Sequence, residues 1–450
     1  MKKYLLLIFL LALGLRLFNL GTASFKEDEF ITQKAVGYIN FCRQNQINCQ
    51  HRPTTLKNQL ISLITNNETK PNLLAEIYLW DFIQDRPSEI HHSRAWPYLY
   101  LAAAIQQWLG ISEFSLRLAG VLAGALLIPV GFIFARYFSG LTGIGLLYAL
   151  ALALAFPLID FSRNARMYAP AITLSLLMVY LWYQLLTDKN LRFWLLTLTL
   201  LVSLVCYWLH SLTLVLLIGV YIFSWFKSRR WFWFFSGLLI VYALIGRLVG
   251  VDFFRKQYLG FSWPPHWQYF NWFYLIGLGL MVVQRQSYWL TLSAVYLVIV
   301  SFFTSWRYGS AYAIALWPIT LLPYLTWRRW LGILTILLIS INLVLKFNYL
   351  YYGRDGRADV KTAYEIIKTK FQPNDKIYAV KLRDYYLNDL PVNTEVIDLE
   401  QNQQVNFNGS GFVVWEAEKS GYIKLEALEY IQDNFQNLSQ GGVNIYRFNL

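Results

Sequence analysis

Two adjacent carboxylates, Asp28 and Glu29, lie in the stretch Ser24 to Phe30, which follows the first long apolar run of the chain almost without a spacer. An unpaired carboxylate at the edge of an apolar phase is costly, so it takes up a proton, reaches water or serves a specific role. A carboxylate in this place could act as a general base or bind a metal ion. The alternative is a juxtamembrane acid that extends to water and has no chemical role.

Cationic side chains, some beside a tyrosine, gather in three other segments. These are Arg163 and Arg166 with Tyr168, then Arg255 with Lys256, and finally Arg307 with Tyr308. Guanidinium groups bind phosphate through charge-assisted, forked hydrogen bonds, so the three segments predict an anion site such as one for a phosphate. The alternatives are contacts with anionic lipid headgroups and simple neutralisation of the two acids.

The composition indicates what kind of protein must position these residues. The chain has 450 residues, of which 56% are hydrophobic and only 14% charged, with a mean hydropathy of +0.38. These values predict a polytopic membrane protein, and the 18% of aromatic residues fits interfacial belts of Trp and Tyr. The net charge of +13 lies mostly between apolar runs, so nucleic acid is not an expected partner.

About eleven apolar runs come near the ~20 residues that a helix needs to cross a bilayer. They are Tyr4 to Leu20, Phe114 to Phe134, Leu141 to Ile159, Tyr168 to Leu186, Phe193 to Leu209, Ser211 to Phe226, Trp231 to Val249, Gln268 to Val283, Ser287 to Ser305, Ser310 to Thr326 and Trp330 to Phe347. Lys2 and Lys3 place the N-terminus in the cytoplasm, and every inward turn is then basic. The acids and the three cationic segments consequently lie outside.

This topology depends on one choice. Pro97 to Leu109 is apolar but too short to span, so we expect an amphipathic or re-entrant helix at the outer surface. If it were a span, the predicted orientation of every later span in the membrane would be inverted. The first run looks like a signal peptide, but the many spans behind it favour an uncleaved anchor. A long first outer loop then covers residues 21–113, and its Cys42 and Cys49 could pair in an oxidising compartment.

Four ordered segments resemble the GT-C glycosyltransferases, in particular the bacterial glycosyltransferase family 39 branch related to protein O-mannosyltransferases and lipid A aminoarabinose transferases. They are Leu15 to Leu20 followed by Asp28-Glu29, Pro97 to Leu101, Glu113 to Leu118, and Ser162 to Ala169. The resemblance covers about Tyr4 to Tyr183. Beyond it only Arg307-Tyr308, before an apolar run, and the overall plan of the chain look similar.

The resemblance implies inverting transfer of a hexose or pentose from a polyprenyl-phosphate donor to a hydroxyl of a lipid, glycan or protein outside the bacterial cytoplasmic (inner) membrane. In that family the acid after the first span is the base, which corresponds to Asp28. Glu29 would orient the acceptor or contribute to a metal site. The departing phosphate would be held by Arg163, Arg166 and Arg307, with Tyr168, Tyr308, Arg255 and Lys256 beside them.

Four histidines have weaker assignments. Relatives carry His or Lys before two prolines where this chain has Ala95-Trp96-Pro97, so His91 and His92, just upstream, could supply the missing group; solvated loop histidines are the alternative. His210, at the outer end of its span, could bond a lipid phosphate or simply lie in the interface. His266 with Glu29 is the candidate for a divalent metal ion.

The last hundred residues change character. Helical and extended patterns alternate over Val360 to Phe371, Lys376 to Val380, Glu395 to Leu399, Gly411 to Trp415, Leu425 to Phe435 and Val443 to Phe448. We therefore expect a membrane domain over residues 1–349 and a small extracytoplasmic α/β domain over residues 350–450. The second domain shows no catalytic motif, and acceptor binding or support of the active-site loops is its hypothetical role.

Two other classes stay open. A lipid-linked sugar transporter or flippase would also be polytopic, but it should carry ionisable residues near the membrane midplane. A surface-polysaccharide polymerase or ligase would also use outward arginines, although an acidic pair after the first span is not expected there. The charges of this chain collect at the ends of its spans, which favours chemistry at the membrane surface over translocation.

Overall fold

A computed structural model describes residues 2–21, 29, 32–33, 35–37, 39–40, 95–188, 192–210, 213–227, 233, 236–237, 272–303, 316–347, 360–379, 396–398, 407, 409–416, 425–439 and 443–449. The chain divides into two compact units. One comprises Met1–Phe18 with Thr32–Lys346, and the other comprises Asn19–Ile31 with Phe347–Leu450.

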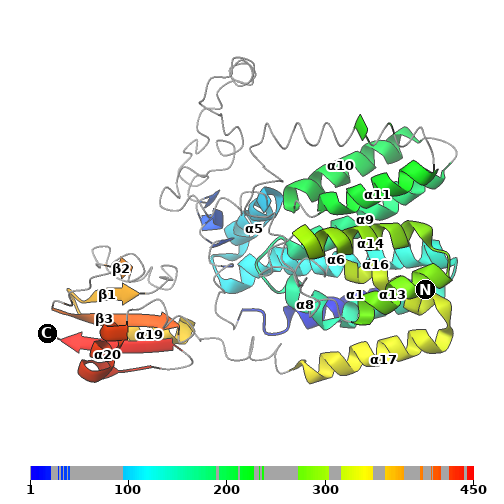
Figure 1. Ribbon diagram of the computed structural model, residues 1–450. Helices are drawn as coiled ribbons and strands as arrows, with labels where there is room; N and C mark the ends of the chain where they lie inside the picture. The colour runs from blue at the N-terminus through cyan, green and yellow to red at the C-terminus, as the bar shows by residue number, and fades with distance from the viewer. Residues whose placement is uncertain are drawn as a thin grey trace, which may run out of the picture. The chain divides into compact units, whose positions relative to one another are not determined.

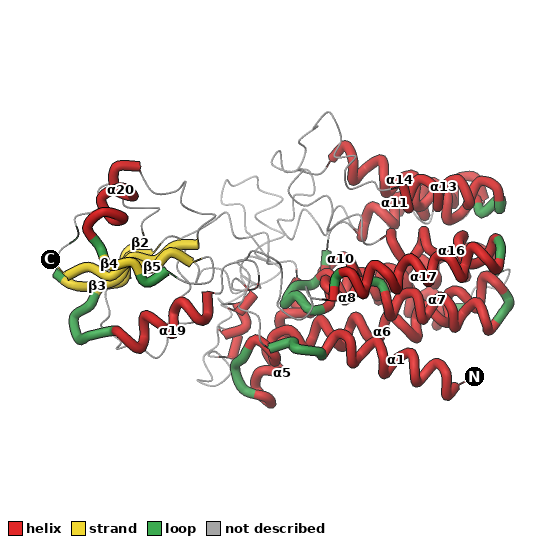
Figure 2. The backbone as a smooth tube through the Cα atoms, turned by 90° about the horizontal axis from the view of Figure 1, so that it is seen from below, coloured by secondary structure: helices red, strands yellow, loops and turns green. Residues whose placement is uncertain are grey.

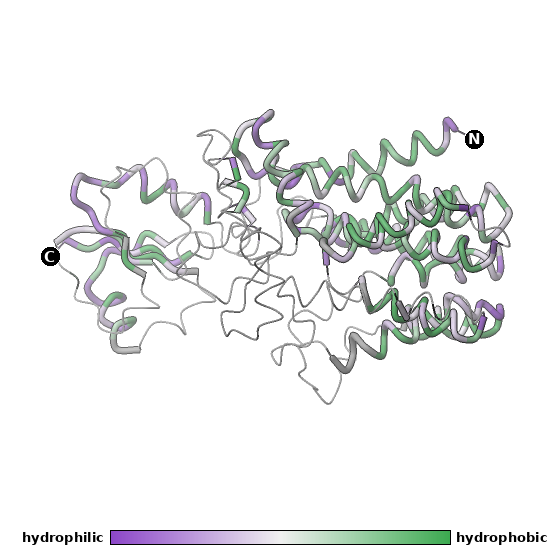
Figure 3. The backbone as a smooth tube through the Cα atoms, turned by 90° about the horizontal axis from the view of Figure 1, so that it is seen from above, coloured by the Kyte–Doolittle hydropathy of each residue, from purple (hydrophilic) through white to green (hydrophobic). Residues whose placement is uncertain are grey.

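Helices make up the described part of the first unit, and they run side by side (Figure 1). Their bounds are α1 Lys2–Leu17, α5 Trp96–Leu109, α6 Glu113–Ser139, α7 Thr142–Leu154, α8 Phe156–Ser162, α9 Tyr168–Thr187, α10 Phe193–Leu209, α11 Thr213–Lys227, α13 Trp272–Val283, α14 Ser287–Phe303, α16 Trp317–Trp327 and α17 Arg329–Leu345. The helices are apolar along most of their length and polar mainly at their ends (Figure 3).

Helix α6 forms the centre of the unit, packing against α1, α5, α7 and α9. Its start is fixed by a capping box, in which the Ser112 side chain accepts from the Ser115 N–H at 3.1 Å and the Ser115 side chain accepts from the Ser112 N–H. Its end is fixed by Gly140, whose φ of +68° suits a residue without a side chain. Both ends of the longest helix are thus specified locally.

Some polar groups inside the bundle bond from one helix to another. The Trp182 indole N–H donates to Ser203 Oγ at 3.1 Å, and the Tyr288 hydroxyl donates to the Val179 carbonyl at 3.0 Å. A buried hydroxyl or indole without a partner would be costly in an apolar interior, so these bonds fix how the helices meet.

By length and composition, α6 and α9 are long and apolar enough to cross a membrane, and the bent pair α7 and α8 would be a third among the described residues. Five further apolar helices are shorter. The predicted helical membrane fold is confirmed in type, but the predicted count of about eleven spans is not. The expected span Leu141 to Ile159 is broken by a bend of 59° at Ala155, because Pro157 has no N–H to continue the helix.

The second unit contains a five-stranded sheet in the order β2-β1-β3-β5-β4. Strand β1 (Lys376–Ala379) is parallel to β2 (Val396–Asp398) and β3 (Ser410–Glu416), whereas β5 (Val443–Asn449) is antiparallel to β3 and β4 (Gln436–Asn437). Helices α19 (Val360–Lys370) and α20 (Leu425–Asn434) lie on opposite faces of it (Figure 2). The predicted small α/β domain is therefore present, with β4 as the strand that the sequence did not reveal.

Candidate functional site

Two of the predicted cations lie in the turn of residues 163–167, which we call the arginine turn. Helix α8 ends at Ser162, and the Arg163 N–H caps it by donating to the carbonyls of Ile159 and Asp160, each at 3.1 Å. Helix α9 begins directly after the turn, at Tyr168. Arg163 and Arg166 are thus held between two helices rather than on an open loop.

The arginine turn lies directly against α6, where two glycines make room for it. A Cβ at Gly120 would lie 2.7 Å from the Ser162 carbonyl oxygen, and one at Gly124 would lie 2.5 Å from the Ser162 Cβ. A larger residue at either position would force the turn away. This Gly-x-x-x-Gly spacing was visible in the sequence as a signal for close packing in membranes, and the sequence analysis missed it.

The Arg163 guanidinium reaches the carboxyl end of α1. Its Nη1 donates to the carbonyl oxygen of Phe18 and to that of Leu15 at 3.5 Å. Carbonyls at this end of a helix lack partners within the helix and carry the negative end of its dipole, so a cation is favoured there. The sequence analysis assigned Arg163 to phosphate, and the structure gives it these backbone partners.

Arg163 is charged at neutral pH. Burial, followed by the positive charge of Arg117, lowers its pKa to about 10, and Asp160 opposes that change. Arg117 is itself buried on α6. Arg117 therefore lies close enough to Arg163 for their charges to interact, and Arg166 follows Arg163 in the same turn.

Arg166 is the most enclosed cation of the turn, with 5% of its surface exposed. Its Cζ lies 5.9 Å from the centroid of the Tyr168 ring, within the range of a cation–π contact. The Tyr168 ring also lies 5.9 Å from the His210 ring and 5.4 Å from Phe161. The Tyr168 ring thus contacts both Arg166 and His210, which follows the end of α10.

His210 is placed by the end of α10. Its N–H donates to the Cys206 carbonyl at 2.9 Å, and its own carbonyl accepts from the Thr213 hydroxyl at 2.7 Å. Both bonds involve the backbone of His210, so they fix its position at the end of α10.

A further buried cation, Arg16 of α1, was seen in the sequence only as part of a family motif. It is fully buried, and its Nη1 donates to Ala12 O at 3.0 Å and Ala153 O at 3.5 Å, while Nη2 donates to Leu152 O at 3.5 Å. A charged residue inside an apolar run was the available signal for this contact.

The acidic pair is only partly described. Glu29 is helical and buried, with 1% exposed, and belongs to the second compact unit. Asp28, His91, His92, Arg255, Lys256, His266, Arg307 and Tyr308 lie outside the described residues, as do Cys42 and Cys49. Within the described ranges no three His, Cys, Asp or Glu side chains group closely enough to hold a metal ion. A metal requirement stays a prediction.

The fold itself is similar to a solved one. The structure matches that of ArnT from Cupriavidus metallidurans bound to undecaprenyl phosphate, with a TM-score of 0.56 and 10% sequence identity. The match covers 99% of this chain and 98% of the ArnT chain. The apo structure of the same ArnT gives a TM-score of 0.47 at 12% identity, over 78% of this chain and 86% of that one. No family model and no curated protein matches the sequence.

The first of these likenesses extends over almost the full length of both chains. ArnT is a GT-C protein, and the GT-C-type fold predicted from the ordered motifs is confirmed. At this level of identity the likeness establishes the fold.

Proposed function

We propose that the protein is an inverting glycosyltransferase that moves a sugar from a polyprenyl-phosphate carrier to an acceptor hydroxyl. The observation that carries this proposal is the end-to-end likeness to ArnT, whose structure holds undecaprenyl phosphate. A fold can host several activities, so the residues must support the chemistry as well.

The arginine turn supplies that support. A phosphate that leaves a glycosidic bond carries the electron pair of the broken bond, and fixed cations in a region of low dielectric stabilise it strongly. Arg166 suits this role because it is enclosed, backed by the Tyr168 ring and near other arginines. The predicted contributions of Arg255, Lys256, Arg307 and Tyr308 would complete the site from other outer segments.

The proposed reaction needs one base and no covalent intermediate. The acceptor oxygen attacks the anomeric carbon from the face opposite the phosphate, its proton passes to the Asp28 carboxylate, and the carbon–oxygen bond to the phosphate breaks. The configuration is inverted, and the carrier leaves as polyprenyl phosphate. Glu29 would orient the acceptor or hold a divalent metal ion with His266, and His91, His92 and His210 are auxiliary candidates.

We further propose that the reaction occurs on the outer side of a bacterial inner membrane. The carrier lipid is a membrane component, and the basic turns of the sequence favour a cytoplasmic location for the opposite ends of the helices. The acceptor could be a lipid such as lipid A, a glycan or a protein.

A transfer assay tests the proposal. The full chain in lipid discs receives a panel of radiolabelled polyprenyl-phosphate sugars with crude envelope acceptors, beside Asp28→Asn and the control Asp188→Asn. We expect transfer by the wild type and the control, and a loss of about 10²–10⁴-fold in Asp28→Asn. Absence of transfer from every donor, with a labelled lipid crossing the bilayer instead, would favour the transporter.

A further inference from the structure

The described part of α1 meets the broken helix pair α7 and α8 through a buried arginine. Arg16 donates to the carbonyls of Leu152 and Ala153, which lie in the last turn of α7. Pro157 occupies the position whose N–H would otherwise continue the ladder to Ala153. The guanidinium therefore supplies a donor where the broken helix lacks one.

A second arginine makes the reverse connection. Arg163, at the end of α8, donates to the carbonyls of Leu15 and Phe18 around the end of α1. One arginine of α1 thus holds the break between α7 and α8, and one arginine after α8 holds the end of α1. Both contacts place a positive charge at the carboxyl end of a helix.

Helix α6 packs against both contacts. Gly124 lies between them, because a Cβ there would be 2.5 Å from the Ser162 Cβ and 3.1 Å from Arg16 Nε. That Nε is buried and has no hydrogen-bond partner among the described residues. The close packing leaves the arginine turn little freedom to shift along α1.

We infer that Arg16 and Arg163 are positioning residues, a reciprocal pair that fixes the arginine turn against the end of α1, and that Arg166 is the turn's ligand for the donor phosphate. Donor binding then depends mainly on Arg166, whereas the rate of the reaction also depends on how firmly Arg16 and Arg163 hold the turn that carries it. The catalytic part of this inference rests on the proposed function; the positioning part does not.

Lysine should not replace either arginine fully. A planar guanidinium presents several donors in a fixed fork, and Arg16 uses both terminal nitrogens on different carbonyls. An ammonium group is a compact charge that is costly to bury, so it would hold fewer of these carbonyls.

The test uses the full chain in lipid discs with four variants: Arg16→Met, Arg163→Met, Gly124→Ala and Arg166→Met. Gly14→Ala is the control, because it also changes α1 but has no atom within 4 Å of the added Cβ. Hydrogen exchange of the peptide covering residues 156–168, the Kd for undecaprenyl phosphate and the kcat for transfer are measured on each.

For Arg16→Met, Arg163→Met and Gly124→Ala we expect exchange in this peptide to rise about tenfold or more. We expect the kcat to fall about 10²-fold, with the Kd within about threefold of the wild type. Arg166→Met should show the opposite pattern, with a raised Kd and little change in exchange. The control should match the wild type in all three measurements.

Unchanged exchange in Arg16→Met and Arg163→Met would overturn the positioning pair, as would a Kd raised by Arg163→Met as much as by Arg166→Met. If Arg16→Met does not fold, Arg163→Met and Gly124→Ala decide, since both keep the buried Arg16. A wild type that transfers no sugar refutes the proposed function, while the exchange measurements still decide the positioning role.

Discussion

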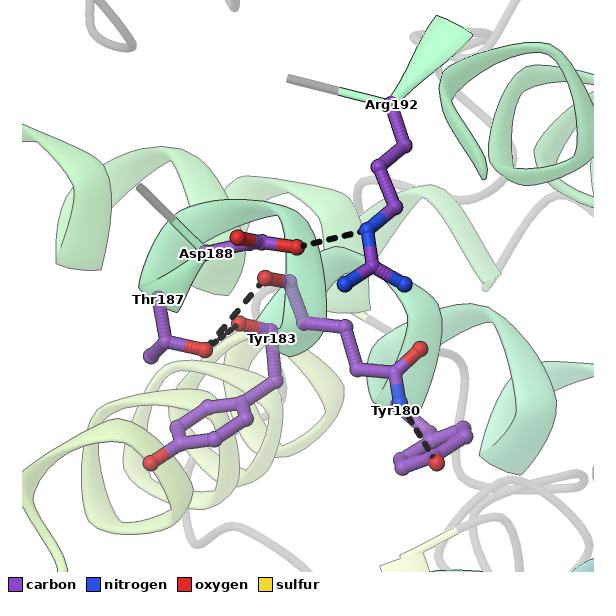
Figure 4. Close-up of polar contacts among 6 residues, drawn as sticks. Tyr180, Tyr183, Thr187, Asp188 and Arg192 are labelled. Atoms are coloured by element: carbon purple, nitrogen blue, oxygen red, sulfur yellow. Dashed lines mark hydrogen bonds and ion pairs between the residues drawn. The ribbon is translucent and has the colours of Figure 1, made fainter. Parts of the chain in front are cut away.

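An arginine lies near each end of helix α9, and the two arginines have different surroundings. At its start, Arg166 is enclosed by protein and faces an aromatic ring. At its other end, Arg192 has a side chain that is 59% exposed, and its Nε lies 3.3 Å from Asp188 Oδ2 (Figure 4). Nearby, the Thr187 hydroxyl donates to the carbonyls of Tyr183 and Gln184, and the Gln184 side-chain amide donates to the Tyr180 hydroxyl.

The contrast separates an exposed charge, which is suited to setting topology, from a charge enclosed by protein. An exposed ion pair contributes about 0–1 kcal/mol and needs only the right sign of charge. An enclosed arginine loses hydration, and the fold tolerates that cost where a specific partner or a ligand uses the group. Substitutions at the start of α9 should therefore matter far more than those at its end.

The largest effect should come from filling the space that admits the arginine turn. Gly120→Ala places a Cβ 2.7 Å from the Ser162 carbonyl oxygen, and overpacking of this kind costs about 1–3 kcal/mol. We expect a loss of that size in the free energy of unfolding, measured by denaturant titration in detergent. Gly143→Ala of α7, with nothing within 4 Å, is the control and should be as stable as the wild type.

A smaller effect is expected from removing the ring beside Arg166. Tyr168→Leu abolishes the cation–π contact, worth about 0.5–2 kcal/mol, so the affinity for undecaprenyl phosphate should fall about 2–30-fold. Tyr168→Phe keeps the ring and should bind nearly as well as the wild type. Isothermal titration separates the two variants, and equal losses in both would mean that the hydroxyl, not the ring, is used.

The smallest effect is expected at the end of α9. Asp188→Asn removes the exposed ion pair, so the free energy of unfolding should change by less than about 1 kcal/mol and transfer should be unaffected. Thermal unfolding and the transfer assay check both statements. A loss of transfer comparable to that of Tyr168→Leu would erase the distinction between the two ends.

Much of the fold could be predicted because bilayer and sheet impose simple periods on the sequence. Helix α10 matches its predicted range, Phe193 to Leu209. The strands β1 and β5 differ from theirs by one residue at one end, and β3 is one residue longer at each end. The break at Ala155 was missed because averaging the hydropathy over a whole span hides a single proline. The two-residue strand β4 is too short to show a period.

The site was harder to predict than the elements. Motif order was enough to single out Arg163, Arg166 and Tyr168, and the position of His210 at the end of a predicted span singled out that residue; the structure places all four in the same unit. Motif order could not show that Arg163 reaches Phe18, since that contact joins residues far apart in the chain and depends on how α1 packs. Nor could it give Arg16 its partners in α7, because these carbonyls lie at the break in that helix.

The most direct test of an anion site at the arginine turn is to measure the Kd for undecaprenyl phosphate of three full-length proteins: the wild type, Arg166→Met and Arg192→Met. The two substitutions remove the same charge at opposite ends of α9. We expect Arg166→Met to bind about 10–100-fold more weakly, the loss typical of a charge-assisted hydrogen bond, and Arg192→Met to bind like the wild type. Equal affinities for all three proteins would contradict an anion site at the arginine turn.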